Sequence, residues 1–150
     1  MNSLTTSISN LFERDVISLI NEILAYPNDD DLWKIAGEIK NPGGNLALHI
    51  AGNLRYYIGH VLNDSGYKRD RKQEFSIKNV SKDEIVELLE TANVEVRDCL
   101  ENMKEERLND PFPIDVLGYE TTVLHFLLHL YGHLNYHLGQ INYHRRMIEK

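Results

Sequence analysis

The sequence predicts an all-α protein, a four-helix bundle whose helices are joined by long crossover connections. Four long stretches place apolar residues at the spacing of one helix face. The segments between them carry proline and glycine and are longer than tight turns, which leaves room for crossovers. The chain has 150 residues, about the length of one domain, so we expect residues 1–150 to form a single bundle with negligible sheet.

Composition restricts the expected partners and compartment. Acidic residues number 23 and basic residues 16, and the net charge of −7 argues against a nucleic-acid partner, which needs clustered Lys and Arg. The single cysteine, Cys99, excludes an internal disulfide and any Cys-rich zinc or iron–sulfur module. No apolar run reaches the roughly 18 residues of a membrane span, and the first residues lack the features of a signal peptide. We therefore expect a cytoplasmic protein with no membrane partner.

The first predicted helix spans roughly residues 5–25. Ser3 or Thr5 is suited to cap its start, and Pro27, followed by a polar run, ends it. A connection with the breakers of residues 41–44 leads to the second helix. The apolar face of the first helix consists of Leu4, Ile8, Leu11, Phe12, Leu19, Ile20 and Ile23.

The second predicted helix runs from Asn45, a favourable N-cap residue, to about residue 63. Gly52 and Gly59 on this helix permit close approach of a neighbouring element. Residues 66–79 follow as a polar, basic loop, which we interpret as solvated in preference to a contact surface for an anionic ligand. The apolar stripe of the helix consists of Leu46, Ile50, Leu54, Tyr57 and Val61.

The third predicted helix begins at a capping box formed by Ser81 and Glu84. A linker over residues 108–119 follows it and contains Pro111 and Pro113, which exclude a regular helix there. The fourth helix is expected over residues 121–148. The stripe of the third helix, in which Cys99 is a small core residue, consists of Ile85, Leu88, Leu89, Ala92, Val96, Cys99 and Met103.

Histidines recur every fourth residue along the fourth helix. The chain has seven histidines, and His125, His129, His133 and His137 form this series. Each successive histidine drifts about 40° around the helix axis, so an adjacent pair, but not all four, can bind one metal ion. His133 and His137 lie nearest the edge of the apolar stripe and are the favoured pair. That stripe consists of Leu124, Leu127, Leu128, Tyr131, Leu134 and Leu138.

A catalytic metal site needs at least a third protein ligand. His49, one residue before a core position of the second helix, is the first candidate. His60 on the same helix is the reserve ligand. His144 lies about 10 Å along the axis from His137 and is left out.

Two segments resemble the DinB-like superfamily. One is Leu-His-Ile-Ala-Gly-Asn-Leu-Arg at residues 48–55, and the other is the His-x-x-x-His pattern of residues 133–137 with the Gly-Gln step at residues 139–140. The resemblance implies a four-helix bundle with one long crossover, often a homodimer, and a zinc or nickel ion held by His49, His133 and His137. Relatives include thiol-dependent S-transferases and a thiol-dependent isomerase. Many relatives carry Arg where this chain has Leu138.

Two hypotheses follow. In the first, the protein is a divalent-metal-dependent transferase or hydrolase that acts on a small molecule with a low-molecular-weight thiol as a partner. Asn53 and Gln140 are then candidates for contacts around the ligands or with the substrate. In the second, the protein is a non-catalytic metal-binding dimeric scaffold or a metal-responsive protein. No acidic residue is placed by a motif beside the histidines, so the sequence assigns no general base.

Overall fold

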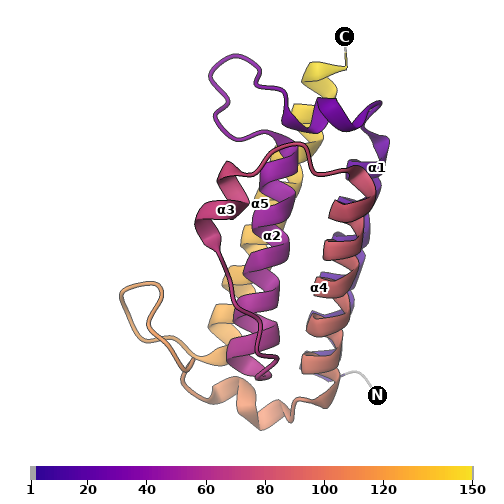
Figure 1. Cartoon of the computed structure of the whole chain (residues 1–150). Helices are drawn as coiled ribbons and strands as arrows, with labels where there is room; N and C mark the ends of the chain where they lie inside the picture. Colours follow the sequence, from indigo (N-terminus) through magenta and orange to yellow (C-terminus); the bar gives the residue numbers. More distant parts are fainter. Residues whose placement is uncertain (1–2, 150) are drawn as a thin grey trace.

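The computed structural model describes residues 3–149, and its long helices run side by side along one axis (Figure 1). The four long elements are α1 (Leu4–Ala25), α2 (Gly43–Leu54) continued by the π-helix η2 (Arg55–Leu62), α4 (Lys82–Asn102) and α5 (Val123–Ile148). Three shorter elements lie in the connections: η1 (Asp29–Trp33), α3 (Arg71–Ser76) and η3 (Glu105–Asn109). Within the described residues, β pairing is limited to an isolated bridge between Pro111 and Thr122. The all-α prediction is therefore confirmed.

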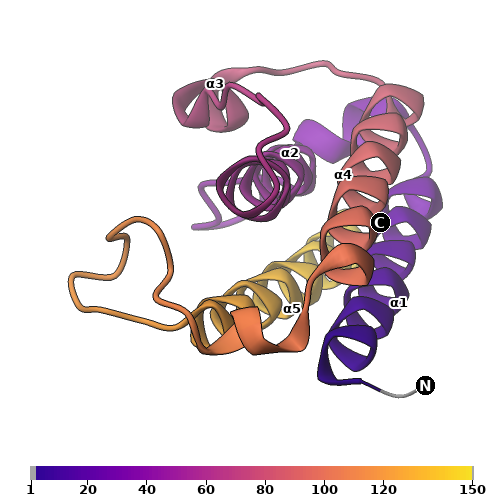
Figure 2. The same cartoon turned by 90° about the horizontal axis from the view of Figure 1, so that it is seen from below.

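The four helices form a ring in which α1 and α2 are diagonal partners. Both of them pack against α4 and against α5, as the view along the axis shows (Figure 2). α1 and α5 run in one direction, and α2 and α4 run in the other (Figure 1). Because α2 and α4 are parallel, the chain between them must return along the length of the bundle. Residues 63–81 make this return and carry α3 against α2, so the predicted long crossover is present.

α1 follows its predicted boundaries closely. Ser3 caps the helix, with its Oγ accepting a hydrogen bond from the Thr6 amide at 3.1 Å. The apolar face is narrower than predicted, because Leu4 and Leu11 are 42% and 38% exposed. These two leucines lie at the rim of a stripe that is centred on Ile8, Phe12, Val16, Leu19 and Ile23.

The second helix begins earlier than predicted and continues as a π-helix in its second half. It begins at Gly43, with Pro42 at the N-cap position, so the predicted cap at Asn45 is wrong. The Asn45 side chain is buried and donates to two backbone carbonyls of the crossover instead. Beyond Leu54 the backbone widens into η2, where a turn holds more residues than an α-turn. Residues four apart then stay on one face, and Ile58 and Leu62 occupy the buried positions predicted for Tyr57 and Val61.

α4 agrees well with its prediction. Ser81 caps it, with Oγ accepting from the Glu84 amide at 3.2 Å. Ala92, Val96 and Cys99 are buried as expected. Burial raises the pKa of the Cys99 thiol to about 11, which keeps it protonated and unreactive at neutral pH.

The core stripe of α5 is rotated from the predicted one by about 60° around the helix axis. Leu128, predicted to be in the core, is 55% exposed. The error arose because α5 contains more leucines than its buried face can hold, so leucine positions alone misplaced the centre of the stripe. The buried apolar residues of α5 are Val123, Phe126, Leu127, Leu130, Leu134 and Ile141.

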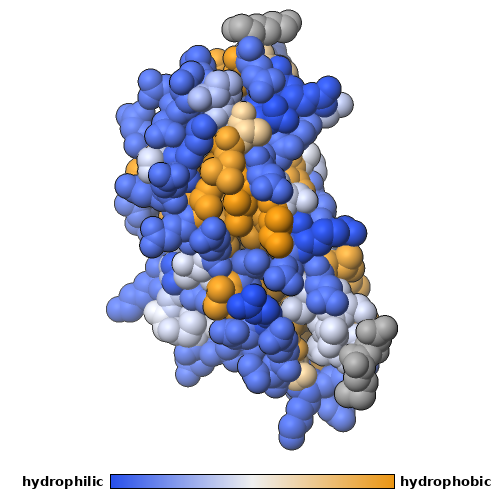
Figure 3. Space-filling model, turned by 90° about the vertical axis from the view of Figure 1, so that its right-hand side faces the viewer, coloured by the Kyte–Doolittle hydropathy of each residue, from blue (hydrophilic) through white to orange (hydrophobic). Residues whose placement is uncertain are grey.

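One face of the molecule shows an apolar band among hydrophilic residues (Figure 3). The band lies on the side of the molecule where α1 and α4 are found (Figure 3). Large exposed apolar side chains on these two helices include Ile17, Leu24 and Val94. No helix within residues 3–149 combines the length and the apolar character needed to cross a bilayer.

His144 joins three parts of the fold at the end of the bundle where α2 begins. Its ring is 1% exposed, and its Nε2 donates to the Lys34 carbonyl oxygen at 2.7 Å. Its Nδ1 accepts from the Tyr26 hydroxyl at 2.7 Å and from the Gly43 amide at 3.3 Å. This histidine is therefore part of the core, in agreement with its exclusion from the metal site.

We predict that His144→Phe destabilises the fold by about 2–3 kcal/mol, because buried polar partners lose their hydrogen bonds. Burial lowers the pKa of His144 below its ordinary value of 6.5. The unfolded chain therefore binds a proton at this residue that the folded chain does not, and stability falls as the pH drops below 6.5. Urea unfolding at about pH 7.5 and about pH 5.5 should show a smaller loss on acidification for the variant. An equal loss in both proteins would contradict this role for His144.

Candidate metal centre

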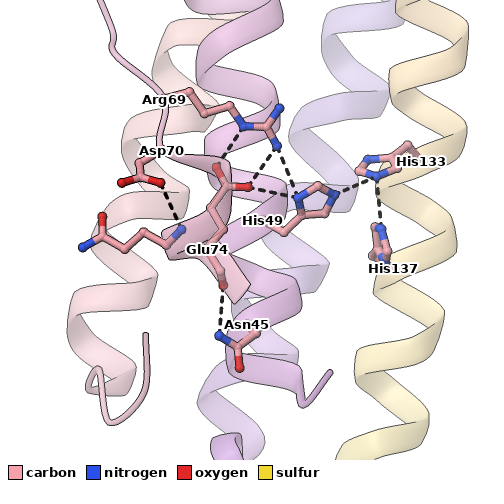
Figure 4. Close-up of polar contacts among 8 residues, drawn as sticks. Asn45, His49, Arg69, Asp70, Glu74, His133 and His137 are labelled. Atoms are coloured by element: carbon pink, nitrogen blue, oxygen red, sulfur yellow. Dashed lines mark hydrogen bonds and ion pairs between the residues drawn. The ribbon is translucent and has the colours of Figure 1, made fainter. Parts of the chain in front are cut away.

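Three histidines from two helices meet between α2 and α5 (Figure 4). The Nε2 atom of His133 lies 3.1 Å from Nε2 of His49 and 3.0 Å from Nε2 of His137. His49 comes from the fully buried α2, and the other two come from successive turns of α5 and are half-buried. The residues that were predicted to act together are therefore close in space.

The rotated stripe of α5 explains why His133 and His137 are the two histidines of this helix that lie close to His49. His133 and His137 border the buried stripe on the side of α2, whereas His125 and His129 are exposed. The pair that was favoured from the sequence is the one that lies close to His49, although Leu128 was misplaced. Because the observed stripe is rotated toward His137, both histidines lie closer to the core than predicted.

The Nδ1 atoms of His49 and His137 point away from the cluster and contact side-chain oxygens. Nδ1 of His49 lies 3.0 Å from Oε1 of Glu74, and Nδ1 of His137 lies 2.7 Å from Oε1 of Gln140. Nη2 of Arg69, which can only donate, also lies 3.2 Å from Nδ1 of His49. The two oxygens are acceptors, and in the tautomers that donate to them both rings carry the proton on Nδ1 and leave Nε2 unprotonated. His133 Nε2 faces both of these atoms and can hold at most one proton. In these tautomers, at least one of the two short Nε2–Nε2 contacts therefore joins two lone pairs, an arrangement that a cation would stabilise.

The donor set fits a divalent ion. Nitrogen ligands about 2.0–2.1 Å from a tetrahedral zinc ion lie about 3.3 Å from each other. This is close to the 3.1 and 3.0 Å that separate Nε2 of His133 from Nε2 of His49 and of His137. Burial and, after it, the neighbouring His137 and His49 lower the pKa of His133 to about 3. Burial also lowers the pKa of His137. Both rings are thus neutral at pH 7, which is the form that binds metal.

The carboxylate that contacts His49 was not predicted from the sequence. Glu74 lies on α3, inside the segment that was interpreted as a solvated basic loop. Arg69 donates from Nε to Oε2 and from Nη2 to Oε1 of Glu74, both at 2.9 Å, and both side chains are at most 9% exposed. The interpretation as a solvated loop is therefore wrong for Arg69 and Glu74 and correct for Lys72, which is exposed. Because Arg69 and Glu74 neutralise each other, the buried carboxylate is compensated.

Two residues of α2 make room for Glu74 and anchor its segment. A Cβ atom at Gly52 would clash with Oε2 of Glu74, so only glycine allows this approach. Asn45 donates from Nδ2 to the backbone oxygens of Glu74 and Ile77, at 2.9 Å in each case. The close approach predicted at Gly52 is thus explained, although the sequence did not identify the approaching residue.

The remaining candidate residues lie around the cluster or apart from it. Asn53 is buried one turn after His49, and its Oδ1 atom has no hydrogen-bond partner among the described residues. Gln140 is exposed and contacts His137. His60 lies in η2, where its Nδ1 accepts from the Gly66 amide at 3.1 Å, and the fold does not bring it to the other histidines.

A cavity of about 450 Å³ opens beside the three histidines. This volume falls within the range of small-molecule sites. The ring of Phe75 forms one wall, 4.7 Å from the ring of His49. The lining residues are Ile39, Lys40, Asn41, Leu46, His49, Arg71, Phe75, His133, Tyr136, His137 and Gln140.

We predict that Gly52→Ala displaces Glu74 and destabilises the protein by about 1–3 kcal/mol, because the new methyl group occupies the position of the carboxylate. Gly139→Ala is the control, since a Cβ atom there meets open space and should stabilise the exposed helix by about 0.5–1 kcal/mol. Thermal unfolding of the two variants measures both effects. A neutral or stabilising Gly52→Ala substitution would contradict the close packing of Glu74.

Comparisons with solved structures agree with this architecture. A conserved protein from Enterococcus faecalis superposes with a TM-score of 0.79 at 16% sequence identity, over 99% of this chain and 98% of that one. A DinB-like protein from Bacillus cereus superposes with a TM-score of 0.70 at 19% identity, over 89% of this chain and 85% of that one. At these identities the likeness shows the fold. A search of curated proteins finds no match.

The family comparison covers nearly the whole chain. Residues 3–150 match the family described as "Protein of unknown function (DUF1572)". The structural likeness to a DinB-like protein agrees with the resemblance carried by the histidine segments. The chain therefore belongs to the DUF1572 family and has the fold of a DinB-like protein.

Proposed function

We propose that the protein is a divalent-metal-dependent enzyme in which His49, His133 and His137 hold a zinc or nickel ion. The observation that carries the proposal is the convergence of three Nε2 atoms, two of them on rings whose Nδ1 atoms contact side-chain oxygens of Glu74 and Gln140. Three protein ligands are typical of catalytic sites, which keep a position open. A divalent ion held there would lower the pKa of a thiol or a water molecule and supply a nucleophile at neutral pH.

The surroundings of the three histidines favour an enzyme over a non-catalytic metal-binding scaffold. His49, His133 and His137 all line the 450 Å³ cavity, which has room for a small molecule beside them. The buried helix α2 and the Glu74 carboxylate hold the His49 ring in one orientation. Such outer contacts orient metal ligands and increase their basicity. The His49 nitrogen is thus held in a fixed position, and the cavity beside it has space for a reactant.

Thiol transfer fits this cavity better than hydrolysis does. No acidic residue is among the residues that line it, and Glu74 is engaged by His49 and Arg69. The described residues therefore include no free carboxylate at the cavity to act as a general base toward water. A thiol has a lower intrinsic pKa than water and depends less on such a base. We therefore favour a thiol-dependent S-transferase, with a hydrolase as the second choice.

We predict that His49→Ala, His133→Ala and His137→Ala each abolish stoichiometric metal binding, because each removes one of the three nitrogen donors. Metal analysis of the purified proteins measures this loss. Glu74→Gln should retain the site with an affinity lowered by about ten- to hundredfold, the usual effect of losing an outer contact to a ligand. Transfer of low-molecular-weight thiols to electrophiles should fall together with the metal content.

His129→Ala provides the matched control, because His129 is an exposed histidine on the same helix outside the cluster. It should leave metal content and activity unchanged. Unchanged metal content in the three cluster variants would refute the proposed site. Thiol transfer that persists after removal of the metal would refute the mechanism, whereas a metal-loaded protein that is inactive with every thiol and electrophile would favour the scaffold.

We also propose that the protein forms a homodimer, as its family resemblance implies. The apolar band on the side of α1 and α4 supports this proposal (Figure 3), because exposed Ile17, Leu24 and Val94 are suited to pack against a second copy. Ile17→Glu should then shift the protein from dimer to monomer in sedimentation velocity experiments. Leu128→Glu, which alters an exposed leucine on α5, should leave the dimer intact. A monomeric wild-type protein would refute the proposal.

A further inference from the structure

The cavity beside the histidines has an unbalanced charge. Two cationic side chains line it, Lys40 from the connection before α2 and Arg71 from the start of α3, and no acidic side chain does. Neither cation lies within ion-pair distance of an acidic group of residues 3–149. The guanidinium group of Arg71 lies 5.3 Å from the ring centroid of Phe75, so the cation rests on the cavity wall.

The positive charge at this cavity, from two exposed side chains, contrasts with the net charge of the whole chain. The chain carries a net charge of −7, with 23 acidic residues available as partners. Most of the other arginines are paired with one of them: Arg14, Arg55, Arg69, Arg97 and Arg145. Two unpaired cations at one cavity of an acidic protein would attract an anionic molecule to a place that the overall charge disfavours.

The other residues that line the cavity indicate that the rest of such a molecule is apolar. Phe75 and Tyr136 present aromatic rings, and Ile39 and Leu46 add aliphatic surface. The ring of Phe75 lies 4.7 Å from the ring of His49, and that of Tyr136 lies 5.3 Å from the ring of His137. An apolar group that enters the cavity therefore lies beside the three histidines, while its charged end can reach a guanidinium or an ammonium group.

We infer that Lys40 and Arg71 form an anion-recognition site, and that the substrate is a small molecule with an apolar body and a carboxylate or phosphate group. This inference rests on the proposed function in placing the reacting part of the substrate at His49, His133 and His137. It changes the interpretation of the basic segment 66–79, since Arg71 from that segment contributes to ligand recognition. The metal ligands and the anion site are separate groups of residues, so each can be tested by itself.

The test is calorimetric binding of three probes to the metal-free and the zinc-loaded protein: 3-phenylpropionate, phenyl phosphate and the neutral 3-phenylpropanol. The metal-free protein should bind at least one of the two anions about tenfold or more tightly than the alcohol, because a hydrogen-bonded charge pair contributes that much. Lys40→Met combined with Arg71→Met should remove the preference while the affinity for the alcohol and the zinc content stay unchanged. The anion that binds more tightly identifies the carboxylate or the phosphate as the recognised group.

The matched control combines Lys72→Met with Lys104→Met, which changes the net charge equally at exposed lysines outside this cavity. It should retain the anion preference. Equal affinity of the wild-type protein for the alcohol and both anions, or a preference that survives in the Lys40 and Arg71 variant, would overturn the inference. Failure of the wild-type protein to bind zinc would refute the metal site separately, because the anion preference is measured without metal.

Discussion

The hydrogen bond between His49 and Glu74 is the interaction on which the site depends. It holds Nδ1 of His49 against the carboxylate and directs Nε2 toward α5, where His133 and His137 lie. The carboxylate can make this bond because Gly52 leaves room for it and Arg69 balances its charge. A buried carboxylate without such a partner would be strongly disfavoured. The crossover is therefore as much a part of the site as the helices that carry the histidines.

The bundle and the crossover contribute different properties. The helices α2 and α5 supply the three imidazoles at positions set by core packing, so the donors stay in place as long as the bundle is folded. The segment around α3 supplies the charged residues Arg69, Arg71 and Glu74, two of which compensate each other while the third lines the cavity. The arrangement separates the three proposed metal ligands, which bind metal in their neutral form, from the cations that we propose recognise a charged reactant.

Helical periodicity was sufficient to predict the four long helices. The four-residue spacing identified the series of histidines, and their position relative to the apolar stripe favoured His133 and His137. Details that depend on tertiary context were missed. The stretch that forms η2 carries a pattern compatible with either an α-turn or a π-turn, so the exchange of Tyr57 for Ile58 in the core was not visible. Glu74 lies 25 residues from His49, and only the path of the crossover brings them together. Asn45 was predicted to cap the helix because asparagine is a favourable N-cap residue. In the fold, its side-chain amide donates instead to the backbone oxygen of Glu74 on α3.

The parallel course of α2 and α4 has a consequence for how proteins of this architecture can diversify. A chain that returns along the bundle is anchored at both ends by helices that pack elsewhere, so its interior can change in length and composition without unfolding them. Here that interior supplies the carboxylate behind one imidazole and a cation at the cavity. Exchanging one segment of about twenty residues (residues 63–81) would therefore change the hydrogen-bond partner of one histidine and the charge of the cavity at the same time.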